Sequence, residues 1–331
     1  MERLRDLDEA GVLQRVLPLY GAAGPAVAVG PGDDAAVIAT PSGSVVATTD
    51  GMVRGRDWRD EWSSGHDVGV KVAVQNIADV AAVGAVPTGL LVALVADPAL
   101  EVAWARDLAA GIAEAARDAG AAVVGGDLSS GPPGVVVVTV TALGDLQGRE
   151  PVLRSGARPG DVVAVCGSLG HSGGGLALLL RSGPSALEWA GAGLVRYHLA
   201  PRPPWESGPL AAAAGASALV DVSDGLATDL GHIARASGVR VDLDGTVLRE
   251  ELAAGPLTEA LGAQEAWNQV LTGGEEHSLV ACFPAGTDVR ALPGERWRVI
   301  GRVAEAGPDG PVVTVDGAVT HARGWDHFTP P

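Results

Sequence analysis

Cysteine, lysine and aromatic residues are scarce in this chain of 331 residues. The two cysteines, Cys166 and Cys282, both lie in apolar runs, so we expect neither a disulfide framework nor a cysteine-based zinc cluster. Aromatic residues make up only 4% of the chain, whereas 47 glycines and 47% hydrophobic residues indicate a core of small side chains. Such a composition is typical of α/β layers rather than of disorder.

Long hydrophobic segments are also missing. The longest clean apolar runs, such as residues 90–96, are much shorter than the roughly 20 residues that cross a bilayer. Residues 1–6 mix charges where a signal peptide needs an apolar stretch. Together with the few cysteines, these features predict a cytoplasmic protein that does not associate with membranes.

Basic residues are few, since 23 Lys and Arg stand against 40 Asp and Glu, a formal net charge of −17. A negative field of this kind repels DNA, RNA and anionic membrane surfaces, so nucleic acid is not an expected partner. The field also repels a phosphorylated small molecule unless divalent cations intervene. The positions of the acidic residues therefore matter more than their number.

The length and the hydrophobic patterns predict two α/β domains, with a boundary in the turn-rich segment 149–151. In residues 1–150 the patterns predict helices at 7–17, 66–83 and 99–119, and strands at 26–29, 35–38, 44–49, 89–96, 121–124 and 135–143. In residues 151–331 they predict helices at 176–180 and 226–237, and strands at 162–166, 218–222, 239–243, 278–283, 298–303 and 312–315.

Acidic residues recur where predicted strands end beside glycine. They are Asp33, Asp34, Asp50, Asp127, Asp221 and Asp224. A strand delivers its last side chain to a fixed point, and neighbouring glycines let a ligand approach, as a hard-cation site with oxygen ligands requires. A single aspartate in such a place is also an ordinary turn former or helix cap. The whole set, drawn from both halves of the chain, favours a metal site.

Three further polar residues are candidates for a binding site. Asp79 lies inside a predicted helix, in one row with Lys71 and Gln75. Lys71 is the only lysine of the chain, which fits a phosphate contact or an ion pair with Asp79 as well as an ordinary surface lysine. Arg154 precedes a predicted strand, a position suited to contacting a phosphate or to forming a surface salt bridge.

Two nucleotide-binding motifs are excluded. Residues 30–35 fit the pattern G-x-G-x-x-A, but a predicted strand follows where a dinucleotide-binding fingerprint needs a helix, and two acids would face the pyrophosphate. The sequence contains no G-x-x-x-x-G-K-[ST], so it has no P-loop. Any nucleotide chemistry must use another scaffold.

A serine hydrolase is an alternative. Residues 170–174 match G-x-S-x-G between a strand and a helix, and Ser172, Asp224 and His277 follow in the order of a catalytic triad. Residues 167–169 separate the strand from the motif, however, and no His-Gly-Gly-type oxyanion segment precedes it. A hydrolase would also leave the earlier acids unexplained, so a glycine-rich turn is the simpler account of this motif.

Eight segments, taken in order, resemble the thiamine-monophosphate kinase family, part of the superfamily of aminoimidazole ribonucleotide synthetase and selenophosphate synthetase. The segments are 30–36, 47–50, 70–85, 124–127, 153–161, 221–226, 271–275 and 324–328. Each is short, but together they cover nearly the whole chain in the order and spacing of the family. The resemblance implies ATP-dependent phosphorylation of thiamine monophosphate to thiamine diphosphate by direct in-line transfer.

The resemblance also implies an α/β subunit of two domains, built like aminoimidazole ribonucleotide synthetase. Its N-terminal domain (1–150), a mixed sheet with helices, would bind ATP and Mg²⁺ and form a homodimer. Its C-terminal α/β domain (151–331) would complete the active site. The acceptor is a phosphate monoester that is already largely ionised, so the obstacle is to bring two polyanions together, and Mg²⁺ held by aspartates would reduce their repulsion.

The resemblance assigns residues to these roles. Family metal ligands match Asp34, Thr48, Thr49, Asp50, Asp79, Asp127, Asp221 and Asp224, of which Asp50, Asp127 and Asp224 are the expected catalytic residues. ATP contacts match Gly126, Asp127, Arg154 and Ser223. Substrate contacts match Asp57, Glu275 and Trp325. Trp325 could stack on the cationic thiazolium or on the pyrimidine, or it could simply pack on the surface.

The sequence departs from the family pattern in four places. Asp57 stands where the family usually has a His that contacts the substrate, and residues 128–130 lack a usual arginine. Glu276 and His171 each stand where Asp is usual. These departures concern the acceptor more than the metal. An enzyme of the same fold with another acceptor, as in aminoimidazole ribonucleotide synthetase, and an inactive ATP-binding scaffold therefore stay open as alternatives.

Overall fold

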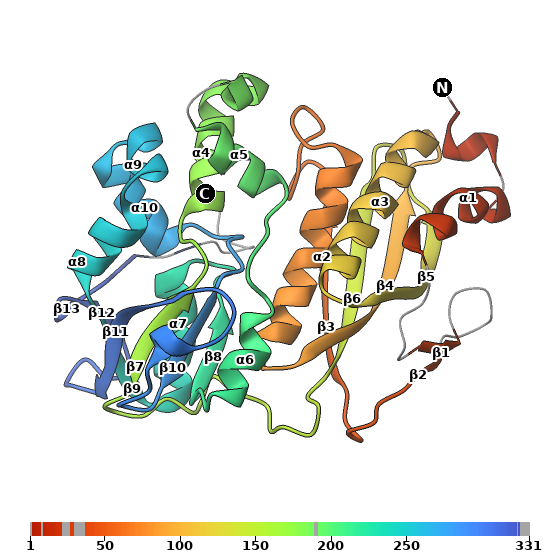
Figure 1. The fold of residues 1–331 in the computed structure, drawn as a ribbon. Helices are drawn as coiled ribbons and strands as arrows, with labels where there is room; N and C mark the ends of the chain where they lie inside the picture. Colours follow the sequence, from red (N-terminus) through yellow and green to blue (C-terminus); the bar gives the residue numbers. More distant parts are fainter. Residues whose placement is uncertain are drawn as a thin grey trace. The chain divides into compact units, whose positions relative to one another are not determined.

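The computed structural model describes residues 2–7, 9–21, 27–29, 37–188, 191–322 and 324. The chain divides into two compact units, the first made of Met1–Val80 and Ala85–Gly148, the second of Ala81–Gly84 and Arg149–Pro331. Each unit combines helices with a β-sheet (Figure 1), which confirms the predicted α/β class. Within the described residues, no helix has the length and apolar character needed to cross a membrane.

The first unit contains a four-stranded sheet in the order β3-β6-β4-β5, and α3 is the crossover between the parallel strands β4 and β5. A short antiparallel pair, β1 and β2, stands apart from this sheet. The elements are η1 (Leu4–Asp6), α1 (Glu9–Val16), η2 (Leu17–Tyr20), β1 (Val27–Val29), β2 (Val37–Ile38), β3 (Val46–Val53), α2 (Gly65–Ala81), β4 (Val86–Ala96), α3 (Val102–Asp118), β5 (Ala122–Ser130) and β6 (Val136–Asp145).

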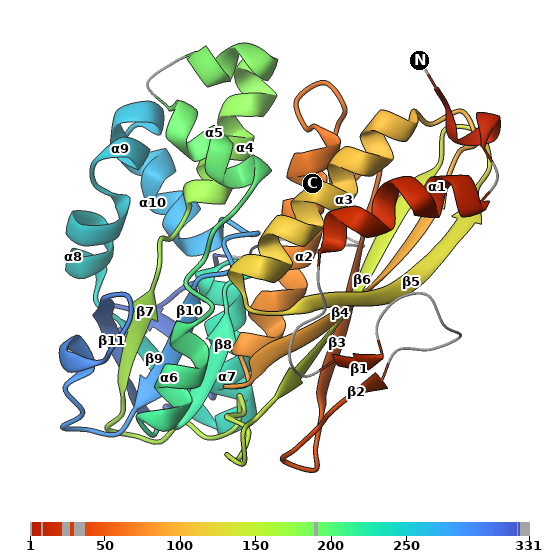
Figure 2. The same cartoon turned by 45° about the vertical axis from the view of Figure 1, so that its right-hand side comes forward.

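Helices α2 and α3 lie side by side against one face of this sheet (Figures 1 and 2). They approach closely because glycines stand where they cross: a Cβ atom on Gly69 would lie 2.1 Å from the Leu108 carbonyl oxygen, and one on Gly111 would lie 2.1 Å from the His66 carbonyl oxygen. The sheet face beneath the helices carries buried residues such as Val140. This face is therefore the core of the first unit.

The second unit contains a seven-stranded sheet in the order β13-β12-β9-β11-β7-β10-β8. Only the pair of β12 and β9 is parallel among its described pairings. The elements are β7 (Val162–Cys166), α4 (His171–Ser182), η3 (Gly183–Glu188), α5 (Ala192–Leu199), α6 (Ser207–Ala213), β8 (Ala218–Asp221), α7 (Leu226–Ser237), β9 (Val239–Leu243), α8 (Gly245–Val247), η4 (Leu248–Ala253), α9 (Pro256–Leu261), α10 (Ala263–Thr272), β10 (Leu279–Phe283), η5 (Val289–Ala291), β11 (Trp297–Glu305), β12 (Val313–Val315) and β13 (Ala318–Val319).

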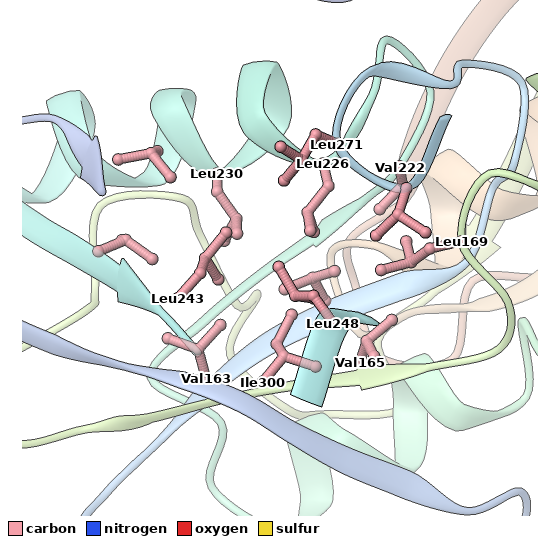
Figure 3. Packing of buried hydrophobic residues seen from close by; sticks show 14 of the residues in the cluster. Val163, Val165, Leu169, Val222, Leu226, Leu230, Leu243, Leu248, Leu271 and Ile300 are labelled. Atoms are coloured by element: carbon pink, nitrogen blue, oxygen red, sulfur yellow. The ribbon is translucent and has the colours of Figure 1, made fainter. Parts of the chain in front are cut away.

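Strands β7, β8 and β10 of this second sheet are buried on both faces. Val163 and Val165 of β7 pack into a cluster with α7, and Figure 3 shows Leu226 and Leu230 of that helix above them. The alternate residues of β7, such as Cys166, belong to a second cluster on the opposite face. Burial on both faces explains why β7 and β10 read as continuous apolar runs in the sequence.

The predicted ends of two strands are wrong. Strand β3 continues beyond the expected residue 49 to Val53, and β5 continues beyond residue 124 to Ser130. Asp50 and Asp127 therefore lie inside strands, not at their ends. Gly and Asp are rare in strands, which is why the prediction stopped at them, but β3 and β5 are edge strands whose side chains can reach solvent.

The predicted helix 226–237 is confirmed as α7, but the other helices of the second unit differ from the prediction. Helix α4 begins at His171, five residues before the predicted helix 176–180, and its first turns contain three glycines. Helices α5, α6, α9 and α10 were not predicted. They have 8, 7, 6 and 10 residues, which is too few turns for a period of 3.6 residues to stand out.

Candidate active site

The first group of site residues lies where α2 meets the edge strand β3. The Thr48 hydroxyl donates a hydrogen bond to Asp79 Oδ2 at 2.8 Å, and the Asp50 backbone N–H donates to Asn76 Oδ1 at 2.9 Å. Strand alternation places the Asp50 side chain on the same face as Thr48. Thr48, Asp50 and Asp79 thus form one cluster of oxygen donors. Lys71 on the same helix is buried, so the surface-lysine interpretation is wrong.

Thr49 and Asp127 face the other side of this sheet. The Thr49 hydroxyl accepts a hydrogen bond from the Thr141 hydroxyl at 3.0 Å. Asp127 follows Gly126 in β5, and its Oδ2 accepts a hydrogen bond from the Ser129 hydroxyl. Asp127 pairs with Ala93, and this pair continues across the sheet to Gly51 of β3. Gly51 is next to Asp50 in the strand, so this row of residues faces the side opposite to Asp50. Asp50 and Asp127 therefore stand on opposite faces and at opposite edges of the sheet, so a single copy of the unit does not bring them together.

Asp57 lies in the turn that follows β3. Its Oδ2 accepts a hydrogen bond from the Val53 backbone N–H at 2.7 Å. The Asp57 backbone N–H in turn donates to the Val53 carbonyl at 2.9 Å. One carboxylate oxygen is therefore engaged in shaping this turn.

The second group of site residues lies at the end of β8. Asp221, the last residue of the strand, is buried, and its Oδ2 lies 3.1 Å from His277 Nδ1. The His277 backbone N–H donates to the Val222 carbonyl at 2.8 Å. His277 therefore holds the Asp221 carboxylate in one orientation.

Asp224 belongs to a cluster at the start of α7. Asp229 Oδ2 accepts hydrogen bonds from the backbone N–H groups of Asp224 and Gly225 at 3.1 and 3.0 Å. Donor atoms of Asp224, Asp229 and His232 lie within 4.8 Å of one another. Burial, followed by the charges of Asp221 and Asp224, raises the pKa of Asp229 to about 8. This accumulation of carboxylates suits a divalent cation.

Asp229 and His232 are not among the site residues predicted from the sequence. They are three residues apart in α7, a spacing that places both side chains on one face of the helix. That spacing was the available signal, because the capping of Asp224 and Gly225 by Asp229 is a local contact.

The candidate ATP contacts of the second unit flank this cluster. The Ser237 hydroxyl donates to the Arg154 carbonyl at 2.9 Å, which fastens the Arg154 loop to the end of α7. The charge of Arg154 adds to burial in lowering the pKa of His232. The Ser223 carbonyl accepts a hydrogen bond from the Glu275 backbone N–H at 2.8 Å. Ser223 and Glu275 thus lie between β8 and the start of α7, whereas the backbone of Arg154 lies beside the last residue of α7.

Three predicted site residues, Asp33, Asp34 and Trp325, lie outside the described residues. Gly324, which precedes Trp325, is described. Its backbone N–H donates to the Thr228 hydroxyl at 3.0 Å, and a Cβ atom on it would lie 1.5 Å from the Asp224 carbonyl oxygen. Only glycine allows this close approach of the C-terminal segment to the start of α7.

The serine-hydrolase alternative is wrong. Ser172 lies inside α4 and is fully buried, and its hydroxyl is 3.1 Å from His198 Nδ1. His277 instead contacts Asp221. Ser172, Asp224 and His277 are therefore not assembled into a triad.

Comparison with known proteins decides the family. Residues 32–146 and 158–313 match the N-terminal and C-terminal domains of the AIR synthase related proteins. The thiamine-monophosphate kinase of Mycobacterium tuberculosis is 45% identical over 99% of this chain and 94% of its own length. The chain belongs to the thiamine-monophosphate kinase family. The two-domain fold expected from the resemblance is thereby confirmed.

Solved structures of the family have the same fold. The thiamine-monophosphate kinase of Stenotrophomonas maltophilia K279a superposes with a TM-score of 0.80 at 30% identity, over 95% of this chain and 98% of its own. AaThiL, complexed with AMPPCP and TMP, superposes with a TM-score of 0.76 at 29% identity, over 99% of both chains.

Proposed function

We propose that the protein transfers the γ-phosphoryl group of ATP to thiamine monophosphate and so forms thiamine diphosphate. The identity of 45% to a thiamine-monophosphate kinase over nearly the full length carries this proposal. The complex of AaThiL with AMPPCP and TMP supports ATP as co-substrate and thiamine monophosphate as acceptor. The acidic clusters of the two units supply oxygen ligands for the divalent cations that such a reaction needs.

The proposed cofactor is Mg²⁺, held by Asp34, Thr48, Thr49, Asp50, Asp79, Asp127, Asp221 and Asp224. The described members offer oxygen donors, the ligand type that Mg²⁺ prefers. The Thr49 hydroxyl lies on the face of the sheet opposite to the Asp50 side chain. Bound Mg²⁺ supplies charge neutralisation to the phosphates.

The residues of the chain then bind and orient the two substrates. Arg154 and Ser223 in the second unit and Gly126 in the first are the proposed ATP contacts, and Glu275, Trp325 and Asp57 the proposed contacts of thiamine monophosphate. A phosphate monoester loses its second proton near pH 6, so the acceptor needs no strong base. Direct in-line transfer then depends on positioning, and the protein needs no phosphorylated residue.

We also propose that the protein acts as a homodimer through its N-terminal domain. Asp50 and Asp127 stand on opposite faces of one sheet, so a second copy is needed if both are to serve one active site. The face opposite α2 and α3 carries Leu91 and Val53, which are 38% and 40% exposed. Covering these side chains with a second copy would remove apolar surface from water.

A panel of acceptors tests the proposed function. The purified protein is incubated with ATP, Mg²⁺ and, in turn, thiamine monophosphate, unphosphorylated thiamine or ribose 5-phosphate, and the products are separated by chromatography. We expect phosphorylation of thiamine monophosphate alone. Asp221→Asn is expected to remove this activity, whereas Asp309→Asn, at an exposed turn, should keep it. Phosphorylation of another acceptor in preference would overturn the proposal.

A further inference from the structure

The loop between α10 and β10 is fastened by a buried glutamate. The Glu276 side chain has no exposed surface. The Ser168 hydroxyl donates a hydrogen bond to its Oε1, and the Ser172 backbone N–H donates to its Oε2 at 2.9 Å. Ser172 lies in the first turn of α4, where backbone N–H groups have no partner within the helix. The Glu276 carboxyl group thus links the loop to the start of α4.

The backbone on both sides of Glu276 is strained. Glu275 and His277 both have φ of 56°, in the left-handed region that non-glycine residues rarely adopt. Hydrogen bonds hold this conformation: Glu275 N–H donates to the Ser223 carbonyl, and His277 N–H donates to the Val222 carbonyl, both at 2.8 Å. Such strain persists only where the surrounding contacts fix the backbone, and Glu276 supplies the contacts on the α4 side.

The strained conformation presents Glu275. Its side chain is 37% exposed and its Oε2 lies 3.5 Å from His198 Nδ1. The Tyr197 hydroxyl, one residue away from His198, donates to the Glu276 carbonyl at 2.9 Å. Glu275 is therefore held from α5 on one side and from β8 on the other, while its carboxylate stays accessible to a ligand.

We propose that Glu276 is a positioning residue that fixes Glu275 for contact with thiamine monophosphate. The proposal rests on the proposed function for the identity of the ligand. Burying a carboxyl group costs stability, so an apolar side chain would serve better if the position had only to fill space. The two hydrogen bonds from Ser168 and Ser172 give the carboxyl group a specific task, which is to hold the loop against its strain.

Three substitutions separate this role from general stability. Glu276→Ala removes both hydrogen bonds. Glu276→Gln keeps them, because the amide oxygen can accept from Ser172 and the amide nitrogen can donate to Ser168. Glu276→Asp withdraws the carboxyl group by one methylene, although the backbone on both sides is held, so at least one of the two bonds is lost. Glu251→Ala, at an exposed glutamate, is the matched control.

The decisive readout is the division of the effect between the two substrates. Glu276→Ala and Glu276→Asp should raise the KM for thiamine monophosphate about tenfold, the usual loss for a hydrogen bond to a charged group, and change the KM for ATP less than about twofold. Glu276→Gln and Glu251→Ala should stay close to the unsubstituted protein. An equal rise of both KM values, or a Gln variant as impaired as the Ala variant, would overturn the assignment.

Hydrogen exchange tests the fastening without any substrate. Glu276→Ala should speed the exchange of the Glu275 and His277 amides, and Glu276→Gln should not. If Glu276→Ala does not fold, Ser168→Ala removes one donor and should give the same change in smaller measure. Unchanged exchange in a folded Ala or Ser168→Ala variant refutes the positioning role, whereas failure of the unsubstituted protein to phosphorylate thiamine monophosphate refutes only the proposed function.

Discussion

At the scale of a single residue, burial of the Glu276 carboxyl group lowers the stability of the folded protein at neutral pH. Full burial raises the pKa of the carboxyl group from 4.5 to about 7, outweighing the hydrogen bonds from Ser168 and Ser172, which lower it. The folded protein therefore holds a proton at pH values where the unfolded chain has released it. Its stability accordingly falls as the pH rises between these two pKa values.

Glu276→Gln removes this dependence. Below about pH 4.5 the carboxyl group is neutral in both states, so the substitution changes little there. Above about pH 7 the unsubstituted protein has lost up to about 3 kcal/mol that the Gln variant keeps. Urea unfolding at pH 5 and pH 8 measures the difference, which should favour the Gln variant increasingly at the higher pH. A difference that is the same at both pH values would refute the raised pKa.

Thr48 gives a second prediction at this scale. Its hydroxyl donates to Asp79 and completes the oxygen cluster beside Asp50, so Thr48→Val should raise the Mg²⁺ concentration needed for half-maximal activity several-fold. Thr88→Val is the matched control, since this strand hydroxyl donates only to the Leu143 carbonyl among the described contacts. Titrations of activity with Mg²⁺ check both variants. An unchanged requirement in Thr48→Val would remove Thr48 from the metal site.

The elements that could be predicted best from the sequence are strands buried on both faces. Strands β7 and β10 are buried on both faces, and their apolar runs gave nearly correct bounds. The predicted strand 121–124 is shorter than β5, because Gly125, Gly126 and Asp127 are typical of a turn in a sequence. An edge strand tolerates these residues. The short helices of the second unit could not be recognised, since they are stabilised by packing rather than by a long periodic pattern.

The same limit applies to the site. The acidic residues could be predicted because each lies beside glycine or in a recognisable segment. The face of the sheet on which each acidic side chain lies could not be predicted. It depends on where the strand ends, and β5 continues past the predicted end at residue 124, so Asp127 is an edge-strand residue and not a turn residue. The link from Glu276 to Ser168 joins residues 108 positions apart, and no local pattern announces it.

The crossing of α2 and α3 yields a prediction at the scale of elements. Gly111→Ala would place a Cβ atom 2.1 Å from the His66 carbonyl oxygen, which the backbone cannot avoid without moving the helices apart. We expect a loss of roughly 1–3 kcal/mol in unfolding free energy. Gly193→Ala, with nothing within 4 Å of the added Cβ in α5, should instead stabilise by up to about 1 kcal/mol. Thermal unfolding measures the Tm of both variants. An equal decrease in the two would contradict the close contact between α2 and α3 at Gly111.

At the scale of the whole molecule, the charge of −17 acquires a meaning. Part of the acidic excess is gathered in two clusters, one beside β3 and α2 and one at the start of α7. Once cations bind, such clusters attract phosphates instead of repelling them. The same charge that makes nucleic acid an improbable partner is thus compatible with a nucleotide substrate.

The proposed dimer gives a prediction of mass. Leu91→Arg introduces a charge on the apolar face of the first sheet and should convert a dimer into a monomer of 33.2 kDa in light scattering. Leu180→Arg, at a leucine that is 60% exposed on α4, should leave the mass unchanged. A monomeric unsubstituted protein, or a dimeric Leu91→Arg variant, would contradict the proposed interface.

Sharing of the active site between copies can be tested by complementation. Asp50→Asn and Asp127→Asn should each be inactive alone. If one site takes Asp50 from one copy and Asp127 from the other, a mixed dimer retains one intact site, and co-expressed variants should regain about a quarter of the activity. If a preparation that contains mixed dimers regains no activity, each active site takes Asp50 and Asp127 from the same copy, which contradicts the shared site.

The measurement that tests the central claim most directly is the fate of the γ-phosphoryl group. The protein is given ATP labelled in that group, Mg²⁺ and thiamine monophosphate, and ADP and thiamine diphosphate are quantified together. We predict that the two products appear in equal amounts, with the label in thiamine diphosphate, and that Asp224→Asn forms neither. Hydrolysis of ATP without labelled thiamine diphosphate, or no product from a preparation that binds ATP, would contradict the account.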